Sequence, residues 1–380
     1  MKKILVFVDW YVPGYRAGGP IRSVKNTVDH LKEEAQFFVV TTDTDYQTTT
    51  PYPDITPDTW QQLDTSETVY YISAPQLHYK TIQRLLSKKK WDAVYLNGIY
   101  SWYFSILPLW LLRNKQIHKI VAPRGMLAEG ALGVKNRKKK AFLALARLLG
   151  IFNGICFHAT HPGEAAQIRK HIDKAASVLT VPNLPALQEM GEWKPRKKER
   201  GEIQIVSIAR ISPEKNTKFC FEILSNVAEG CSVIFHLYGP INDQVYWQEC
   251  QHLMGALPPH VQVEFKGSIP NDKVAAMLTN YHLMFLPSLG ENFGHIIVEA
   301  LTSATPVLIS DRTPWTGLEQ KGVGWDISLN KPTDYSKIIE QLAQMDQQEY
   351  NLLSKSAYSF ARGIHTNPDA LQHYQRLFQL

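Results

Sequence analysis

Short apolar runs alternate with amphipathic segments along the first half of the chain. The apolar runs have the length and composition of buried strands, and the segments between them have helical periodicity. The predicted strands are residues 4–10, 37–42, 69–73, 93–97 and 119–123, and the predicted helices are 23–32, 81–87 and 104–113. Buried strands separated by helices are typical of a parallel sheet with crossover helices.

The same alternation starts again near residue 203. The predicted strands are 203–209, 232–239, 261–267, 282–288 and 306–310, and the predicted helices are 218–227, 244–254, 271–280 and 295–303. A Pro-Asn-Leu-Pro stretch at 182–185 and a polar, basic stretch at 189–200 separate the two series, as expected of a linker.

We therefore predict an α/β protein made of two Rossmann-like, doubly wound parallel-sheet domains that face each other across a cleft. Their expected bounds are 1–185 and 186–359, with a C-terminal helix at 360–380 that packs back on the first domain. In such sheets ligands bind beyond the carboxyl ends of the strands, so the loops after each strand are the places to search for a site.

Composition agrees with a two-domain globular protein. The 380 residues exceed the usual size of one hydrophobic core. The net charge of +6 is modest, but basic residues cluster at 135–140 and 194–200.

The four cysteines lack C-x-x-C spacing, which favours reduced thiols in a cytoplasmic protein. The first apolar segment ends at Asp9, too early for a signal peptide, and no apolar run is long enough to predict a transmembrane helix.

The stretch GENFGHIIVEA, residues 290–300, joins a predicted strand to a predicted helix. A helix starting near Gly294 and His295 would present free N–H groups and a positive dipole end, which suit a phosphate. Glu299, one turn inside, could accept hydrogen bonds from a ribose diol, and Glu291 could reach hydroxyls of a group beyond the phosphates. Alternatively, Glu291 is an ordinary loop residue and Glu299 a solvated helix position.

Two further loops carry candidate chemistry. Arg210 and Lys215 follow the strand at 203–209 and could neutralise a departing diphosphate; the alternative is a basic surface loop. Gly18 and Gly19 follow the first strand and precede a helix, so their backbone could approach a ligand closely. This loop is neither G-x-G-x-x-G nor a P-loop, and a plain tight turn is the competing interpretation.

Together these motifs resemble the retaining nucleotide-sugar glycosyltransferases of the GT-B fold, the E-x7-E group similar to glycosyltransferase family 4. The resemblance rests on Glu291 and Glu299 with Phe-Gly between them, on Arg210 and Lys215, and on Gly18-Gly19. Further segments look like a bacterial polysaccharide-assembly branch of that group: 123–127 (PRGML), 157–160 (FHAT) with Glu164, and 181–183 (VPN).

The resemblance implies a role for each matching residue. Glu291 would contact hydroxyls of the donor sugar, and Glu299 the ribose. Arg210 and Lys215 would hold the diphosphate. The remaining implied contacts are backbone amides around Phe293, Gly294 and His295, the backbone at Gly18 and Gly19, and Arg124 where many relatives carry a histidine. The reaction of this group needs no metal or cofactor, and we interpret Asp43-Thr44-Asp45 as a coincidental Asp-x-Asp. His158 and His161 are interpreted as structural.

The expected activity is transfer of a hexose, with retention, from a UDP- or GDP-sugar to a glycan or lipid-linked acceptor in the synthesis of O-antigen, capsule or lipopolysaccharide. A nucleotide-sugar epimerase of similar architecture is the alternative enzyme, against which the pair Arg210 and Lys215 with E-x7-E argues. A non-catalytic glycan-binding protein is the third hypothesis.

The segment 135–149, KNRKKKAFLALARLL, has two interpretations. Lysines beside a Leu/Ala/Phe helix could lie on the anionic inner face of the plasma membrane, where lipid-linked acceptors reside. Alternatively, it is a core-packed helix with a solvated basic start. Nucleic-acid binding is not expected, because the basic stretches lack interleaved aromatic residues.

Overall fold

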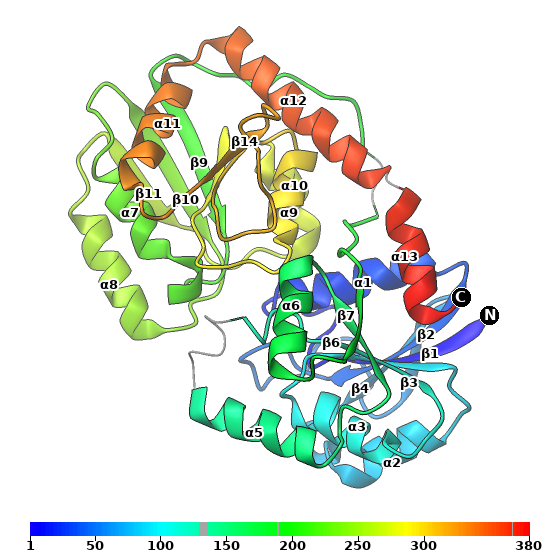
Figure 1. The fold of residues 1–380 in the computed structure, drawn as a ribbon. Coiled ribbons are helices and arrows are strands. Elements are labelled where there is room, and N and C mark those ends of the chain that lie inside the picture. The colour runs from blue at the N-terminus through cyan, green and yellow to red at the C-terminus, as the bar shows by residue number, and fades with distance from the viewer. Residues whose placement is uncertain (129–135, 188–189, 367) are drawn as a thin grey trace. The chain divides into compact units, whose positions relative to one another are not determined.

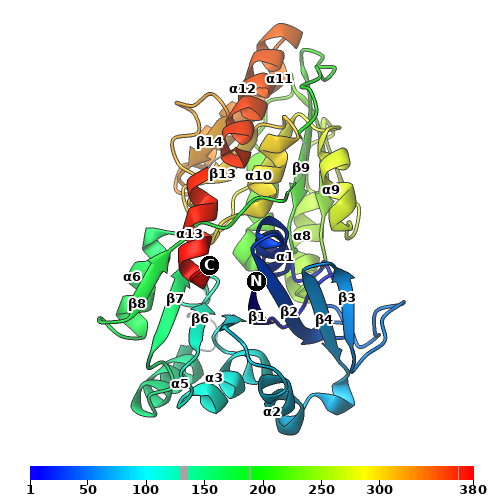
Figure 2. The ribbon, with the colours of Figure 1, turned by 90° about the vertical axis from the view of Figure 1, so that its right-hand side faces the viewer.

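The computed structural model describes residues 1–128, 136–187, 190–366 and 368–380, and these form two compact units (Figure 1). Unit 1 comprises Met1–Leu187 and Asn367–Leu380, and unit 2 comprises Gln188–Thr366. Each unit contains one sheet with helices on both faces, so each is described by itself (Figure 2).

Unit 1 is built on an eight-stranded sheet in the order β3-β4-β2-β1-β5-β6-β7-β8. Its strands are β1 Lys2–Phe7, β2 Ala35–Thr42, β3 Trp60–Asp64, β4 Glu67–Ile72, β5 Ala93–Asn97, β6 His118–Ala122, β7 Ile155–Ala159 and β8 Ser177–Thr180. All neighbours pair in parallel except β3 and β4. The expected parallel sheet is therefore present, with one antiparallel hairpin at its edge, because the two residues between β3 and β4 allow only an antiparallel connection.

The helices of unit 1 cover both faces of this sheet. They are α1 Gly19–Leu31, α2 Tyr79–Ser87, α3 Leu107–Leu112, α5 Asn136–Leu148, α6 Pro162–His171 and α13 Pro368–Phe378, with a 3-10 turn η1 at Ala74–Gln76 and a π turn η2 at Trp102–Ile106. Alternate residues of β1 enter different cores: Leu5 and Phe7 join one, and Ile4 and Val6 join the other. Burial on both faces explains why β1 is apolar from Ile4 to Phe7, beyond the two lysines at its start.

The C-terminal helix α13 belongs to unit 1. Its Tyr374, Leu377 and Phe378 are buried in the core that also contains Ile4 and Val6. The helix expected at 360–380 is in fact two helices. Residues up to His365 belong to α12 (Gln347–His365) of unit 2, and α13 begins at Pro368.

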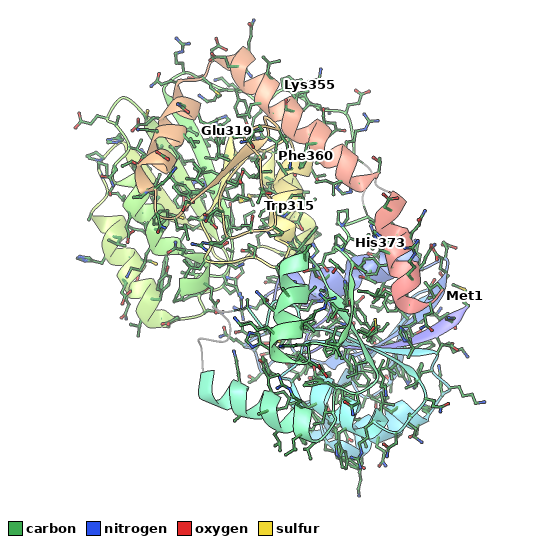
Figure 3. All side chains as sticks on the ribbon, viewed as in Figure 1. Met1, Trp315, Glu319, Lys355, Phe360 and His373 are labelled. Atoms are coloured by element: carbon green, nitrogen blue, oxygen red, sulfur yellow. The ribbon has the colours of Figure 1, made fainter. Side chains whose placement is uncertain are left out.

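Unit 2 has a six-stranded, wholly parallel sheet in the order β11-β10-β9-β12-β13-β14. Its strands are β9 Glu202–Ile208, β10 Ser232–Tyr238, β11 Val261–Phe265, β12 Leu283–Leu286, β13 Val307–Ser310 and β14 Gly324–Ile327. Its helices are α7 Thr217–Leu224, α8 Gln244–Gly255, α9 Asn271–Leu278, α10 His295–Thr302, α11 Pro332–Gln344 and α12, with a 3-10 turn η3 at Pro213–Lys215. Apolar side chains fill both faces (Figure 3).

The strand orders define a switch point in each sheet. In unit 2 the chain builds β10 and β11 on one side of β9 and then returns to place β12 on the other side. In unit 1, β1 lies in the same way between β2 and β5. Loops leave such neighbouring strands in opposite directions and open a crevice between them, which is where α/β sheets bind ligands.

None of the described helices is both long and apolar enough to cross a membrane.

Candidate functional site

The switch point of unit 2 brings together two of the predicted residues. Lys215 ends the turn η3 after β9, and Glu291 lies in the loop between β12 and α10. The Lys215 Nζ and Glu291 Oε1 atoms are 2.5 Å apart, although the residues are 76 positions apart in the sequence. Both side chains are largely shielded, with exposed fractions of 18% and 10%. A shielded ion pair is a stronger electrostatic feature than a surface one, because water screens it less.

Main-chain contacts fix the loop after β9 to the loop after β12. Asn216 adopts a left-handed conformation with φ 57°, and its side-chain amide donates to the carbonyl of Pro287 at 3.1 Å. The Leu289 N–H donates to the carbonyl of Glu214 at 2.9 Å. The loop after β13 joins them, since the Glu291 N–H donates to the carbonyl of Arg312 at 3.2 Å. Lys215 and Glu291 are therefore held by a backbone framework as well as by each other.

The helix α10 begins at His295, as predicted, with Gly294 as its N-cap. Gly294 has φ 77°, a conformation that favours glycine, and a Cβ there would lie 2.7 Å from Cδ1 of Ile297, so the Ile297 side chain would have to shift. The N-terminus of α10 lies beside Glu291, since a Cβ on Gly294 would be 3.8 Å from Cγ of Glu291. Glu299 lies one turn into this helix and is half-buried.

Phe293, just before the N-cap, is fixed by a residue that the sequence analysis missed. The Trp315 indole N–H donates to the carbonyl of Phe293, and the two rings lie 5.5 Å apart. The Phe293 ring also meets the His295 ring edge-on at 4.8 Å. Trp315 follows β13, so only the strand order places it next to the loop after β12.

Arg210 lies in the loop after β9 and keeps one third of its side chain exposed. Its Nη2 atom is 3.9 Å from Oε2 of Glu214, a distant pair that leaves the guanidinium accessible. The backbone carrying Arg210 is packed against Gly239, a second residue that the sequence analysis missed. Gly239 has φ 142°, and a Cβ there would lie 1.9 Å from the carbonyl oxygen of Ala209.

In unit 1, Gly18 is the N-cap of α1 and Gly19 is its first residue. Gly18 has φ 70° and ψ −121°, a conformation that favours glycine. The preceding loop is fixed by Asp45, whose buried carboxylate accepts the N–H groups of Tyr15 at 2.9 Å and of Arg16 at 3.2 Å. Asp45 thus anchors the loop's backbone. Among the described residues no group of three or more His, Cys, Asp or Glu side chains is arranged to hold a metal ion.

Arg124 is held by side chains at the carboxyl ends of the strands of unit 1. Its guanidinium donates to the Tyr95 hydroxyl at 2.7 Å, to Oδ1 of Asn97 at 2.9 Å and to Oδ1 of Asn183. The next amide, Gly125 N–H, donates to the fully buried Glu164 at 2.6 Å. These bonds set the position and direction of Arg124; its contact with a donor remains a prediction.

His158 lies beneath this network and is fully buried. Its Nδ1 atom accepts the Tyr95 hydroxyl at 2.7 Å, and its Nε2 atom lies 2.8 Å from the carbonyl of Val181, to which it donates. Burial, with a smaller contribution from nearby Arg124, lowers the pKa of His158 to about 3. His158 is therefore a neutral core residue, in keeping with the expected structural role. His161 caps α6 through Nδ1.

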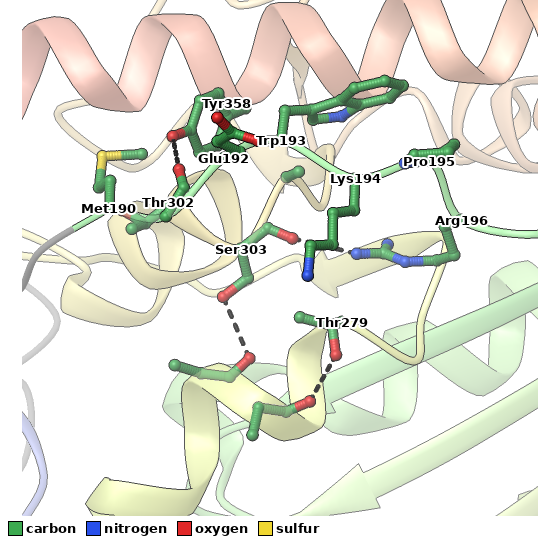
Figure 4. Close-up of a pocket in the computed structure, with 14 residues that line it drawn as sticks. Met190, Glu192, Trp193, Lys194, Pro195, Arg196, Thr279, Thr302, Ser303 and Tyr358 are labelled. Carbon is green, nitrogen blue, oxygen red and sulfur yellow. Dashed lines mark hydrogen bonds between the residues drawn. The ribbon is translucent and has the colours of Figure 1, made fainter.

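A hollow of about 540 Å³ in unit 2 lies away from these loops (Figure 4). The linker segment 190–196 covers it from one side. Thr279 and Ser303, the residues that follow α9 and α10, line it together with Tyr358 of α12. Arg196 donates to the carbonyl of Ser303 at 3.0 Å just after the end of α10. Helix C-termini lie at the amino ends of the strands in such a sheet, so this hollow is at the edge opposite the Lys215–Glu291 pair.

A family model and one curated protein match this chain. Residues 190–360 match the model of the family described as "Glycosyl transferases group 1". An uncharacterized 41.2 kDa protein in the cps region of Klebsiella pneumoniae is 19% identical over 321 residues, which are 83% of this chain and 86% of that protein.

Solved structures that align with almost all of the chain include the following two. The Alr3699/HepE protein of Anabaena, solved with UDP and glucose, has a TM-score of 0.69 at 13% identity, covering 100% of this chain and 99% of its own. WaaG, a glycosyltransferase involved in lipopolysaccharide biosynthesis, has a TM-score of 0.69 at 12% identity, covering 99% and 98%. The fold predicted from the sequence is confirmed as GT-B. Together with the family match, it supports a glycosyltransferase.

Proposed function

We propose that the protein is a retaining glycosyltransferase that moves a hexose from a nucleotide sugar to an acceptor in the synthesis of a cell-surface polysaccharide. The observation that carries the proposal is the Lys215–Glu291 pair at the switch point of unit 2, beside the N-terminus of α10. A cation, a carboxylate and the N-terminal end of a helix in one place match the parts of a nucleotide sugar.

Each part of the donor has a candidate partner in unit 2. Lys215 and Arg210 neutralise the diphosphate, and the amides at Phe293, Gly294 and His295 approach its oxygens. Glu291 accepts hydrogen bonds from hydroxyls of the sugar. Glu299, one turn further along α10, does the same for the ribose. When a donor binds, the phosphate oxygens compete with Glu291 for Lys215, so the ion pair of the free protein is exchanged for contacts with the ligand.

The proposed chemistry is metal-independent. As the bond between the sugar carbon and the diphosphate breaks, negative charge grows on the leaving phosphate, and the two cations stabilise it. The acceptor hydroxyl oxygen bonds to that carbon on the face from which the nucleotide leaves, and its proton passes to a phosphate oxygen. Configuration is thereby retained. Gly18, Gly19 and Arg124 of unit 1 are proposed as further donor contacts.

The names of two similar proteins support a polysaccharide acceptor. One relative is named for the cps region of Klebsiella pneumoniae, and WaaG is named for lipopolysaccharide biosynthesis. The HepE structure contains UDP and glucose, which supports a UDP-sugar as the first donor to be tried.

A peripheral contact with the inner face of the plasma membrane is part of the proposal. Residue 135 of the predicted segment lies outside the described residues, and α5 covers Asn136–Leu148. Leu143 and Ala146 are buried in the core, whereas Leu145, Leu148 and Leu149 are exposed by 54%, 83% and 57%. Exposed leucines on a basic helix suit an anionic lipid surface. Cosedimentation with phosphatidylglycerol vesicles, compared with phosphatidylcholine vesicles and with Leu148→Ser, tests this contact.

The activity is tested by screening UDP- and GDP-sugars for thermal stabilisation of the purified protein, because a ligand that binds the native state raises its melting temperature. The stabilising donor is then supplied with glycan acceptors, with and without EDTA, and NMR follows the anomeric configuration of the product. Retention of configuration and full activity in EDTA are expected. Inversion, or loss of activity that magnesium restores, would contradict the proposed mechanism.

A further inference from the structure

The switch point of unit 1 carries a polar pair that the donor site does not use. Asp9 follows β1, and Ser101 follows β5, the strand that pairs with β1 in parallel. The Ser101 hydroxyl donates to Oδ1 of Asp9 at 2.7 Å. Two loops from neighbouring central strands therefore meet through a carboxylate and a hydroxyl, at the carboxyl edge where such sheets bind ligands.

The half-buried carboxylate of Asp9 accepts fewer hydrogen bonds than two buried carboxylates of unit 1. Glu164 accepts main-chain N–H groups on both oxygens, and so does Asp45. Ser101 is the side chain that donates to Asp9, and Oδ2 of Asp9 takes no hydrogen bond from another residue in the described part of the chain. Burial raises the pKa of Asp9, an effect that the Ser101 hydrogen bond partly offsets. Asp9 thus has capacity for one more donor.

Aromatic side chains directly follow both members of the pair. Trp10 is half-exposed and meets the Tyr46 ring edge-on at 4.9 Å. Trp102 is 57% exposed, unusual for so large an apolar side chain. The two loops that carry the Asp9–Ser101 pair thus also carry aromatic side chains. This combination suits a sugar ring, which offers apolar C–H faces to an aromatic ring and hydroxyl donors to a carboxylate.

We infer that Asp9, held by Ser101, accepts a hydrogen bond from a hydroxyl of the sugar acceptor, and that Trp102 packs on an apolar face of that sugar. The inference rests on the proposed function, because only a transferase needs an acceptor site. It assigns the acceptor to the carboxyl edge of β1 and β5 through Asp9, Ser101 and Trp102, residues that no motif of the sequence indicated.

The test uses the nucleotide sugar selected by thermal stabilisation and, as acceptor probes, the p-nitrophenyl glycosides of glucose, galactose, mannose and N-acetylglucosamine. Initial rates are measured over a range of acceptor concentrations. Release of nucleotide without acceptor is measured separately. Asp9→Asn should lower acceptor kcat/KM about 10- to 100-fold, the usual effect of losing a charged hydrogen bond, and leave donor KM unchanged. Trp102→Ala should raise acceptor KM several-fold. Because the Trp102 side chain is exposed, its removal should not unfold the protein, so a higher KM would report on acceptor binding.

The matched control is Asp92→Asn. Asp92 is an exposed carboxylate at the amino end of β5 that accepts the Lys3 N–H at 2.7 Å, so the same substitution is made at the opposite edge of the sheet. It should leave acceptor kinetics unchanged.

Unaltered acceptor kinetics in Asp9→Asn and Trp102→Ala would overturn the inference, as would equal losses of transfer and of nucleotide binding in Asp9→Asn. Wild-type protein that releases nucleotide but uses none of the four glycosides would also contradict it. Failure of the wild-type protein to bind or cleave any nucleotide sugar would instead refute the proposed function, so the two failures are distinguishable.

Discussion

The buried imidazole of His158 predicts an acid-sensitive unit 1. His158 is fully buried, and its pKa falls from 6.5 to about 3, chiefly because burial disfavours the charged ring. In the unfolded chain the same imidazole is protonated below about pH 6.5. The native state therefore keeps its full stability above that pH and loses stability as the pH falls from 6.5 towards 3.

The magnitude follows from the difference between the two pKa values. Within this window each pH unit changes the free energy of unfolding by about 1.4 kcal/mol for one group. At about pH 5 the contribution of His158 is then a loss of about 2 kcal/mol, a large fraction of the stability of a typical domain.

The assay is urea denaturation of wild type and His158→Gln at about pH 7.5 and pH 5. Glutamine can still donate to the carbonyl of Val181 but does not titrate, so carboxylate effects common to both proteins cancel in the comparison. The variant should be less stable at pH 7.5, because Tyr95 loses its acceptor, yet it should lose about 2 kcal/mol less on acidification. Exposed His78, changed in the same way, is the control. An identical acid-induced loss in wild type and His158→Gln would refute the reasoning.

Two further predictions concern unit 2. Glu291→Ala should reduce transfer at least about 100-fold while changing UDP affinity less than about threefold, because the carboxylate is assigned to the sugar; rates and calorimetry check this. A large loss of UDP affinity would contradict that assignment. Gly239→Ala should displace the backbone before Arg210, since its Cβ would overlap the Ala209 carbonyl. The free energy of unfolding, measured in urea, should fall by about 2–4 kcal/mol, and nucleotide binding should weaken. Unchanged stability would contradict the prediction, because it would mean that the backbone before Arg210 can move without loss of free energy.

The central strands were predictable because their burial dictates their composition. The buried residues of β1, β5 and β9 are mostly apolar, and each strand was located to within three residues. Three strands at sheet edges escaped the analysis. β3 (WQQLD) and β8 (SVLT) are largely exposed, and β14 (GWDI) is mostly only half-buried. β7 (ICFHA) is buried but short, and its histidine obscured an apolar pattern.

The sequence predicted which loops carry the candidate site, but not how the residues on those loops contact one another. Arg210, Lys215, Glu291 and Gly294 could be found because each follows a recognisable strand. Their mutual contacts depend on which strands are neighbours, and a local sequence pattern does not contain that order. The dependence of the Arg210 loop on Gly239 was missed for the same reason.

Asp45 is a further residue whose role could not be predicted from the sequence. As part of Asp-Thr-Asp it was set aside as a coincidental metal motif. In the fold it accepts main-chain N–H groups from a loop about thirty residues earlier, a role that depends on tertiary structure alone.

The measurement that tests the account most directly is calorimetric titration of UDP and GDP into wild type, Lys215→Ala and Lys218→Ala. Lys218 is the matched control, since it lies three residues away and forms an exposed pair with Glu249 at 2.8 Å. If the diphosphate binds at the loops after β9 and β12, Lys215→Ala should weaken binding of the preferred nucleotide about 10- to 100-fold, and Lys218→Ala should leave it unchanged. Equal affinity in all three proteins would contradict the placement of the donor site.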